Sequence, residues 1–222
     1  MSEAKTKNTL VHDALILFAI TLVAAIALGF VYEITKDPIA QTEAQAKADA
    51  YQAVFPELVS AEEMTQTILD KANALISSDK VYEGVTIDEI ARAVDGSGTT
   101  LGWVLTVTST KGYGGKITLT MGISNGLGSN AKERGVLRGI EFLTISETPG
   151  LGMNAKEDKF KSQFKDAKVG QYSLSKRNIS GDTEIDAISS ATITTTAVTR
   201  SVNAGLKVAA EVLYETMNLI DN

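Results

Sequence analysis

One apolar run near the N-terminus interrupts an otherwise mixed pattern of hydrophobic and polar positions. Residues Ala14 to Tyr32 carry no charge over 19 consecutive positions. As a helix with about 1.5 Å of rise per residue, this run spans roughly 28 Å, close to the ~30 Å hydrocarbon core of a bilayer. The alternatives are a buried core helix and a cleaved signal peptide, but a signal peptide has a shorter apolar region and a small-residue cleavage site. We therefore predict one retained transmembrane helix over 14–32.

The positions after this run indicate a helical linker. Ile39 to Val54 intersperses charged residues with an alanine-rich face, and Phe55-Pro56 predicts the end of this helix. Residues 60–86 are mixed and polar, with a few apolar positions that fit one face of a helix. We assign 1–13 to a cytoplasmic N-terminus and 33–86 to a linker helix followed by a helical and polar region.

From residue 87 the period of the pattern changes to the alternation that is typical of strands. Glycine-containing segments at Asp95–Gly98 and Lys111–Gly115 separate the first three runs, and short connections favour antiparallel pairing. The sequence thus predicts an α+β fold, with an antiparallel sheet meander and packed helices over 87–222. The predicted strands are Glu89–Val94, Leu101–Thr108, Lys116–Ile123 and Val136–Ser146.

The C-terminal part returns to helical spacing. Lys156 to Phe164 predicts a helix with Phe160 and Phe164 on one face, and Ile185–Ile188 predicts a short strand or turn. Thr195 to Ile220 predicts the last helix, whose apolar stripe would pack in the core. The stripe consists of Val198, Val202, Leu206, Ala209, Leu213, Met217 and Ile220.

The composition of the chain excludes several kinds of catalytic and metal-binding site. The chain has no cysteine, which excludes disulfides, thiolate nucleophiles, iron–sulfur ligation by cysteine and zinc–thiolate sites. Its one histidine, His12, lies beside the apolar run, so the folded part has no histidine-based catalytic triad. Any redox chemistry must therefore come from an organic cofactor. The net charge of −6 argues against nucleic acid as a partner.

The charges that flank the apolar run predict its orientation. Lys5 and Lys7 precede the run, whereas Lys36 is the one nearby basic residue after it. The positive-inside rule then puts the N-terminus in the cytoplasm and the bulk of the chain on the extracytoplasmic side. The bias is small, but it favours this orientation.

A cluster of hydroxyl side chains follows Asp186 and precedes the last predicted helix. Serines and threonines often cap helices, and on composition alone a cap is the favoured interpretation. A helix N-terminus also offers unpaired N–H groups and the positive end of the helix dipole, which suit a phosphate. The hydroxyls belong to Ser189, Ser190, Thr192, Thr194, Thr195 and Thr196.

Two glycine-containing segments could line a ligand. In Glu147-Thr148-Pro149-Gly150-Leu151-Gly152, proline and glycine favour a tight turn, and small residues let backbone amides approach a planar group. Gly112-Tyr113-Gly114-Gly115 is a weaker signal, because glycine-rich hairpin loops are common and it lacks the ending of a phosphate-binding P-loop. An ordinary turn remains the alternative for each segment.

The heptapeptide from Asp186 to Thr192 resembles the flavinylation motif Asp-x-x-(Ser/Thr)-(Gly/Ser)-Ala-Thr, whose last threonine carries FMN through a phosphoester bond. Together with the membrane anchor and the two glycine segments, the order of motifs is similar to that of the G subunit of the Rnf complex. The C subunit of the sodium-translocating NADH:quinone reductase is a relative of that family. Ser190 departs from the more usual glycine, but a small side chain still fits.

The resemblance implies a role for each matching position. Thr192 would be the attachment site for FMN, and a separate flavin transferase would deliver FMN from FAD and leave AMP. Lys176 would contact the flavin. The residues that would present Thr192 to the transferase are Asp186, Ser189, Ser190 and Ala191. Those that would lie against the isoalloxazine ring are Glu147, Thr148, Gly150 and Leu151. Thr194 and Thr195 would line the phosphate end.

The resemblance also implies a function. The chain would be an electron-transfer subunit with covalent FMN in a membrane complex that couples ferredoxin oxidation and NAD⁺ reduction to Na⁺ or H⁺ translocation. It would have no complete active site alone. Its partners would be the other Rnf subunits, the flavin transferase and membrane lipid. A C-type subunit of the quinone reductase is an alternative, although the length favours the Rnf subunit. A membrane-anchored binding module without a redox role is another alternative.

Overall fold

A computed structural model describes residues 3–124, 135–175 and 181–214, which divide into two compact units, 1–46 and 47–222. Helix α1 (Glu3–Val54) makes up the described part of the first unit and continues into the second. Among the described residues it is the one helix long and apolar enough to cross a membrane. Large apolar side chains of the predicted span, including Leu15 and Phe18, are exposed, which rules out a buried core helix.

The structure joins the two N-terminal helices that we predicted separately. α1 is continuous through Pro38, which lies inside the helix, and ends at Val54 as predicted. Proline removes only one helical hydrogen bond, so an otherwise strong helical sequence can continue past it. The subdivision at residue 87 stays a prediction, although Ala72, Ile76 and Tyr82 belong to the same core as the sheet.

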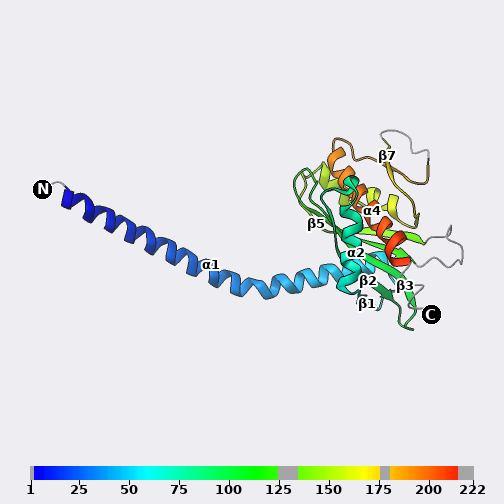
Figure 1. The fold of residues 1–222 in the computed structure, drawn as a ribbon, viewed down its shortest axis with the longest axis horizontal. Coiled ribbons are helices and arrows are strands. Elements are labelled where there is room, and N and C mark those ends of the chain that lie inside the picture. Colours follow the sequence, from blue (N-terminus) through cyan, green and yellow to red (C-terminus); the bar gives the residue numbers. More distant parts are fainter. Residues whose placement is uncertain (1–2, 125–134, 176–180, 215–222) are drawn as a thin grey trace. The chain divides into compact units, whose positions relative to one another are not determined.

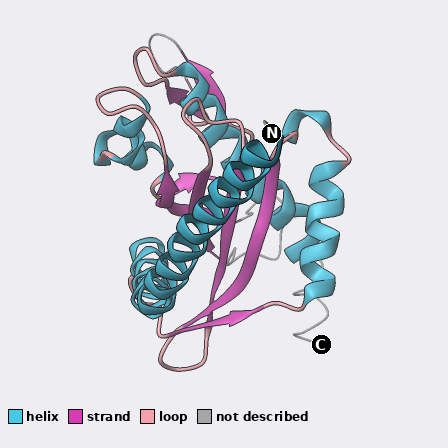
Figure 2. Ribbon diagram, turned by 90° about the vertical axis from the view of Figure 1, so that its left-hand side faces the viewer, coloured by secondary structure: helices cyan, strands magenta, loops and turns pink. Residues whose placement is uncertain are grey.

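The predicted meander is confirmed as a six-stranded antiparallel sheet in which each strand pairs with the next along the chain (Figure 1). Its strands are β1 (Ser60–Glu63), β2 (Val85–Val94), β3 (Thr100–Ser109), β4 (Ile117–Ser124), β5 (Val136–Ile145) and β6 (Ala167–Lys168). Figure 2 shows its long strands side by side, with helices beside them. A separate parallel pair consists of β7 (Ser173–Ser175) and β8 (Glu184–Asp186).

Helices cover the sheet on both faces. α2 (Gln66–Ser77) and α4 (Thr192–Val208) pack in the main core with Trp103, Leu105 and Met121. α4 continues as a π-helical turn, η4 (Ala209–Leu213). On the opposite face, a smaller cluster joins the end of α1 to β2 and β3, so the central strands are buried on both sides.

The end of α1 is also attached to the sheet by polar contacts within the second unit. The Tyr51 hydroxyl donates to Glu89 at 2.7 Å, and the Lys47 ammonium lies 2.6 Å from the same carboxylate. Burial, followed by the hydrogen bond to Glu89 and then the Glu89 charge, raises the pKa of the Tyr51 hydroxyl above its ordinary value. These contacts fix the last turns of α1 against β2.

Two helix predictions need correction. Residues 156–164 form three short turns rather than one helix: the end of η2 (Gly152–Lys156), α3 (Asp158–Lys161) and η3 (Ser162–Phe164). The extended backbone of Glu157, with ψ 144°, separates the first two, although Phe160 and Phe164 do pack edge to face at 5.6 Å. One further short helix, η1 (Lys80–Tyr82), precedes β2.

The last helix begins at Thr192, three residues before the predicted start at Thr195. Its apolar stripe is confirmed as core packing from Val198 to Leu213. Met217 and Ile220, the last two members of that predicted stripe, lie outside the described residues. The early start puts the final threonine of the Asp186–Thr192 segment on the first turn of the helix.

Candidate functional site

The hydroxyl cluster forms a turn that leads into α4. Ser190 has a left-handed backbone with φ +61°, and Ala191 is the N-cap residue. No side chain caps the helix at Ala191, so Thr192 is not the N-cap residue. Thr192 is the first helical residue and its side chain is exposed. The structure therefore presents this hydroxyl to solvent at the start of a helix.

The Thr195 side chain hydrogen-bonds to the backbone of this turn. Its buried hydroxyl donates to the Ala191 carbonyl at 2.9 Å and accepts from the Ile188 N–H at 3.2 Å. The Ala191 N–H in turn donates to the Ile188 carbonyl at 3.0 Å. One side chain thus holds both ends of the turn that carries Ser189 and Ser190. The predicted role of Thr195 as a phosphate-lining residue stays a prediction.

The Glu147 turn and the Gly112–Gly115 loop are joined directly. The Glu147 carboxylate is buried and accepts from the backbone N–H groups of Tyr113 at 2.8 Å and Gly114 at 3.2 Å. Charge-assisted hydrogen bonds of this kind are stronger than neutral ones. The carboxylate therefore fixes the glycine loop beside the turn.

The turn also reaches the start of α4. A Cβ placed on Gly152 would lie 2.6 Å from Thr194 Oγ1 and 2.7 Å from Glu147 Oε2, so a larger side chain there would require these side chains to move. Thr194 is buried at this contact. The three motifs singled out in the sequence therefore meet in one region of the fold.

The proposed ring-lining residues lie on the exposed side of this region. Thr148, Gly150 and Leu151 are exposed, whereas Glu147 is buried beneath them. Tyr113 of the glycine loop and Ile193, directly after Thr192, are also exposed large side chains. Lys176 lies outside the described residues.

A cavity of about 610 Å³ adjoins the segment before Thr192. One wall is part of the motif itself, and the other comes from the short turns between Gly152 and Phe164. No pattern in the sequence predicts the second wall, because those residues precede the motif by more than 20 positions and carry no signature of their own. The lining residues are Asn154, Glu157, Lys159, Phe160, Gln163, Asp186, Ala187, Ile188 and Ser189.

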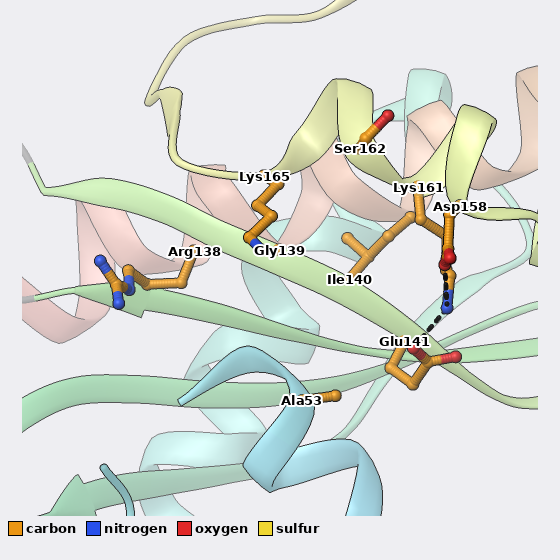
Figure 3. Close-up of a pocket in the computed structure, with 9 residues that line it drawn as sticks. All are labelled: Ala53, Arg138, Gly139, Ile140, Glu141, Asp158, Lys161, Ser162 and Lys165. Carbon is orange, nitrogen blue, oxygen red and sulfur yellow. Dashed lines mark hydrogen bonds and ion pairs between the residues drawn. The ribbon is translucent and has the colours of Figure 1, made fainter. Parts of the chain in front are cut away.

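A second cavity of about 400 Å³, between β5 and the α3 region, does not adjoin these motifs (Figure 3). The Lys161 ammonium lies between the Glu141 carboxylate at 2.7 Å and that of Asp158 at 3.6 Å. Arg138 points away from that group in Figure 3 and pairs with Asp166 at 3.1 Å. Because Lys161 and Arg138 are already paired with carboxylates, these two side chains are weak candidates for binding an anion in this cavity.

Comparison with known proteins identifies the family of this chain. The profile of the FMN-binding domain matches residues 112–207, and that of the RnfG N-terminal region matches residues 1–54. The G subunit of the Na⁺-translocating ferredoxin:NAD⁺ oxidoreductase complex of Acetobacterium woodii is 32% identical over 197 residues, covering 87% of this chain and 88% of the relative. The chain belongs to the RnfG family. Its FMN-binding domain contains all three motifs.

Other relatives and solved structures extend the comparison. The G subunit of the proton-translocating complex of Clostridium ljungdahlii is 27% identical, covering 93% of this chain and 95% of the relative. The crystal structure of NqrC from Shewanella oneidensis has a TM-score of 0.51 at 15% identity, covering 76% of this chain and 94% of that one. The C subunit of the Na⁺-translocating NADH-quinone reductase of Parabacteroides distasonis has a TM-score of 0.50 at 17% identity, covering 78% and 94%. These structural likenesses show the fold alone.

The left-handed backbone of Ser190 (φ +61°) predicts that a serine at this position of the RnfG chain costs stability. A left-handed conformation costs a residue with a Cβ roughly 1–2 kcal/mol, whereas glycine adopts it freely. After allowing for the greater freedom of glycine in the unfolded chain, we expect Ser190→Gly to raise the free energy of unfolding by about 0.5–1 kcal/mol. The midpoint of thermal unfolding in detergent measures this change.

Ser189→Gly is the matched control, since Ser189 is equally exposed but is not among the described residues with positive φ. Glycine at that position gains only flexibility in the unfolded chain, so the midpoint should fall. A rise of equal size in both variants would contradict the left-handed strain at Ser190.

Proposed function

We propose that this chain is an electron-carrying subunit whose FMN is held by a phosphoester bond to Thr192. The observation that carries the proposal is the exposed Thr192 hydroxyl on the first turn of α4, beside the contact between Glu147, Gly152 and the Gly112–Gly115 loop. A serine or threonine at an exposed, fixed position can be esterified without unfolding its surroundings. The match of residues 112–207 to the FMN-binding domain supports the same cofactor.

Attachment requires a flavin transferase that carries FAD. The Thr192 oxygen bonds to the phosphorus of the FMN half, the pyrophosphate bond breaks, AMP leaves, and the hydroxyl proton is released. The linkage joins FMN through its phosphate, so the isoalloxazine ring stays chemically unmodified. A covalent bond also prevents loss of the cofactor on the side of the membrane where no cytoplasmic pool can replace it.

The residues around Thr192 would hold and orient the bound group. The exposed surface of Thr148, Gly150 and Leu151 would lie against the ring, with Glu147 fixing the turn beneath it. Thr194 and Thr195 would support the phosphate end, and Lys176 would contact the flavin. FMN supplies the capacity to accept and donate one or two electrons, while the protein sets its potential through hydrogen bonds and nearby charge.

The relatives' names support a place in a membrane complex that oxidises ferredoxin and reduces NAD⁺. We propose that the chain passes electrons between other Rnf subunits, without binding ferredoxin or NAD⁺ itself. One relative is named as translocating Na⁺ and another as translocating protons, so family membership leaves the coupling ion open. Membrane lipid would surround residues 14–32.

The mass of one tryptic peptide tests the proposal. Cleavage after Arg177 and Arg200 releases Asn178–Arg200, which contains the whole Asp186–Thr192 segment. After co-expression with a flavin transferase, we expect this peptide to be heavier by one FMN less one water. An unmodified peptide from a chain that is co-expressed with an active transferase would contradict the proposal.

We further propose that the FMN domain faces the extracytoplasmic side, as the flanking lysines predict. The absence of cysteine permits a direct test by single-cysteine labelling. A membrane-impermeant maleimide should label Lys159→Cys, an exposed position, in intact cells or spheroplasts. Lys7→Cys should be labelled only after lysis. The reverse pattern would put the domain in the cytoplasm.

A further inference from the structure

The Glu147 carboxylate is a buried negative charge beside the start of α4. Its residue is only 8% exposed, and its two oxygens accept from successive backbone N–H groups, Oε1 from Tyr113 at 2.8 Å and Oε2 from Gly114 at 3.2 Å. Successive N–H groups in a turn form a concavity that binds anions. The loop therefore holds the carboxylate with backbone donors, which carry no net charge and leave its negative charge uncompensated.

Two glycines enclose this carboxylate. A Cβ on Gly112 would lie 2.8 Å from Glu147 Oε1, and one on Gly152 would lie 2.7 Å from Oε2. Because neither glycine carries a side chain, the backbone closes over both oxygens and leaves little room for water. A charge is screened less in such a place, since the effective dielectric constant is lower than in bulk solvent. The charge of Glu147 therefore acts over a longer distance than that of an exposed carboxylate.

No basic side chain neutralises this charge within the part of the chain that the structure describes. Two other half-buried carboxylates are paired: Glu89 with Lys47 at 2.6 Å, and Glu141 with Lys161 at 2.7 Å (Figure 3). Glu147 forms no ion pair with any described lysine, arginine or histidine. A buried carboxylate without a cation is costly to keep, which suggests a use other than stability.

The charge lies close to the proposed point of FMN attachment. Thr194 is on the same first turn of α4 as Thr192. Its hydroxyl oxygen and Glu147 Oε2 lie 2.6 and 2.7 Å from the same point, the place where a Cβ on Gly152 would be. FMN that is joined to Thr192 leaves the helix from this turn, and one short ribityl chain links its phosphate to its ring. The ring is therefore confined to the neighbourhood of Glu147.

We propose that Glu147 tunes the cofactor electrostatically, because its buried charge lowers the reduction potential of FMN. The inference rests on the proposed function above and assigns the tuning charge to one residue. Reduction of FMN by two electrons, with uptake of one proton from solvent, adds one negative charge to the ring. The electrons come from the partner subunits of the proposed function. A fixed negative charge nearby disfavours the added charge, so the bound FMN gives up its electrons more readily.

The midpoint potential of FMN in the purified full-length chain tests this inference. The chain is co-expressed with a flavin transferase, and the flavin absorbance is followed during a titration with dithionite as the reductant. Glu147→Gln keeps the size of the side chain and removes its charge, so the potential should rise. Two unit charges about 12 Å apart at an effective dielectric constant of about 20 shift an equilibrium by about tenfold, which is about 30 mV for a two-electron couple.

Two further variants separate the charge from the shape of the loop. Glu147→Asp keeps the charge and should retain a potential close to that of the parent chain. Gly114→Ala disturbs the same loop but leaves the carboxylate in place, so its potential should stay below that of Glu147→Gln. Glu141→Gln is the matched control, because this carboxylate of β5 is already paired with Lys161. It should leave the potential unchanged.

Three results would overturn the inference. The first is an unchanged potential in folded Glu147→Gln. The second is a rise of equal size in Glu147→Gln and in either variant that keeps the charge, which would assign the effect to the shape of the loop. The third is an equal rise in Glu141→Gln, which would make the effect unspecific.

A different substitution answers the same question if Glu147→Gln does not fold. Thr148→Lys adds a positive charge to the exposed side of the same turn, so it should also raise the potential. An unchanged potential in this variant would show that charge at the turn does not reach the ring, and would overturn the inference as well. A parent chain that carries no FMN would instead contradict the proposed function.

Discussion

Thr192→Ala is expected to leave the chain without covalent FMN. Alanine has no hydroxyl oxygen to bond to phosphorus, and the nearby hydroxyls are differently placed. The Thr196 hydroxyl donates to the Thr192 carbonyl at 2.7 Å, and the Thr195 hydroxyl is buried in the turn. Flavin fluorescence of the denatured chain in a gel, together with the mass of the 178–200 peptide, measures the loss.

Two substitutions make this result specific. Thr192→Ser keeps a hydroxyl at the same position, so it should retain covalent FMN, although the reaction can be slower. Thr196→Ala removes the next hydroxyl along the same helix face and should keep the full adduct. Because Thr192 is exposed at the helix start, Thr192→Ala should unfold within a few degrees of the parent chain. A full adduct on Thr192→Ala would move the attachment to another residue.

Gly114→Ala is expected to have the largest effect on stability. A Cβ on Gly114 would lie 2.2 Å from the Ser146 carbonyl oxygen, far inside van der Waals contact with an atom of the backbone. The loop or the strand end must move, and the movement lengthens the hydrogen bond from the Gly114 N–H to Glu147. Overpacking of this kind typically costs about 1–3 kcal/mol. Urea unfolding of the detergent-solubilised chain measures the loss.

The same substitution should also loosen the packing of the turn against the flavin ring, because Glu147 fixes the turn that is proposed to lie beneath the ring. Gly96→Ala is the control: it changes a glycine in an exposed turn where a Cβ would meet its nearest neighbour, Val59 Cγ2, at 3.6 Å, an ordinary contact. We expect the free energy of unfolding of Gly96→Ala to stay within about 0.5 kcal/mol of the parent value. Parent-like stability of Gly114→Ala would contradict the close approach of Gly114 to Ser146.

The sequence predicted those elements that carry a strong pattern of their own. The four long strands alternate and are separated by glycine or polar segments, and each was predicted within a few residues of its ends. β1 and β6 were missed because four and two mostly polar residues carry no period. The predicted helix over 156–164 was wrong because Phe160 and Phe164 have helical spacing, while Glu157 has an extended backbone that no local signal reveals.

The site was predictable only as separate pieces. The resemblance named Glu147, Thr192 and their neighbours, but nothing in their spacing says that Glu147 accepts from the N–H of Tyr113, 34 residues before it. Gln163 was missed entirely, because a glutamine in a short polar turn is ordinary as sequence. The Asp186 N–H donates to the Gln163 side-chain oxygen at 2.7 Å, and this requires the chain to return to Gln163 after β6 and β7. Long-range backbone contacts of this kind follow from tertiary structure, which a local pattern does not contain.

The short outer strands of the sheet have a consequence for a protein that is anchored in a membrane. Neighbouring copies diffuse in one plane and meet repeatedly, and an open strand edge is a template for pairing with another chain. At one edge, β1 offers only four residues, of which Glu62 pairs with Arg92 and Glu63 with Lys47. At the other, β6 pairs with only Val136 and Leu137 of β5 and ends in Lys168. Short, charged outer strands of this kind disfavour strand pairing between neighbouring copies at both of these positions.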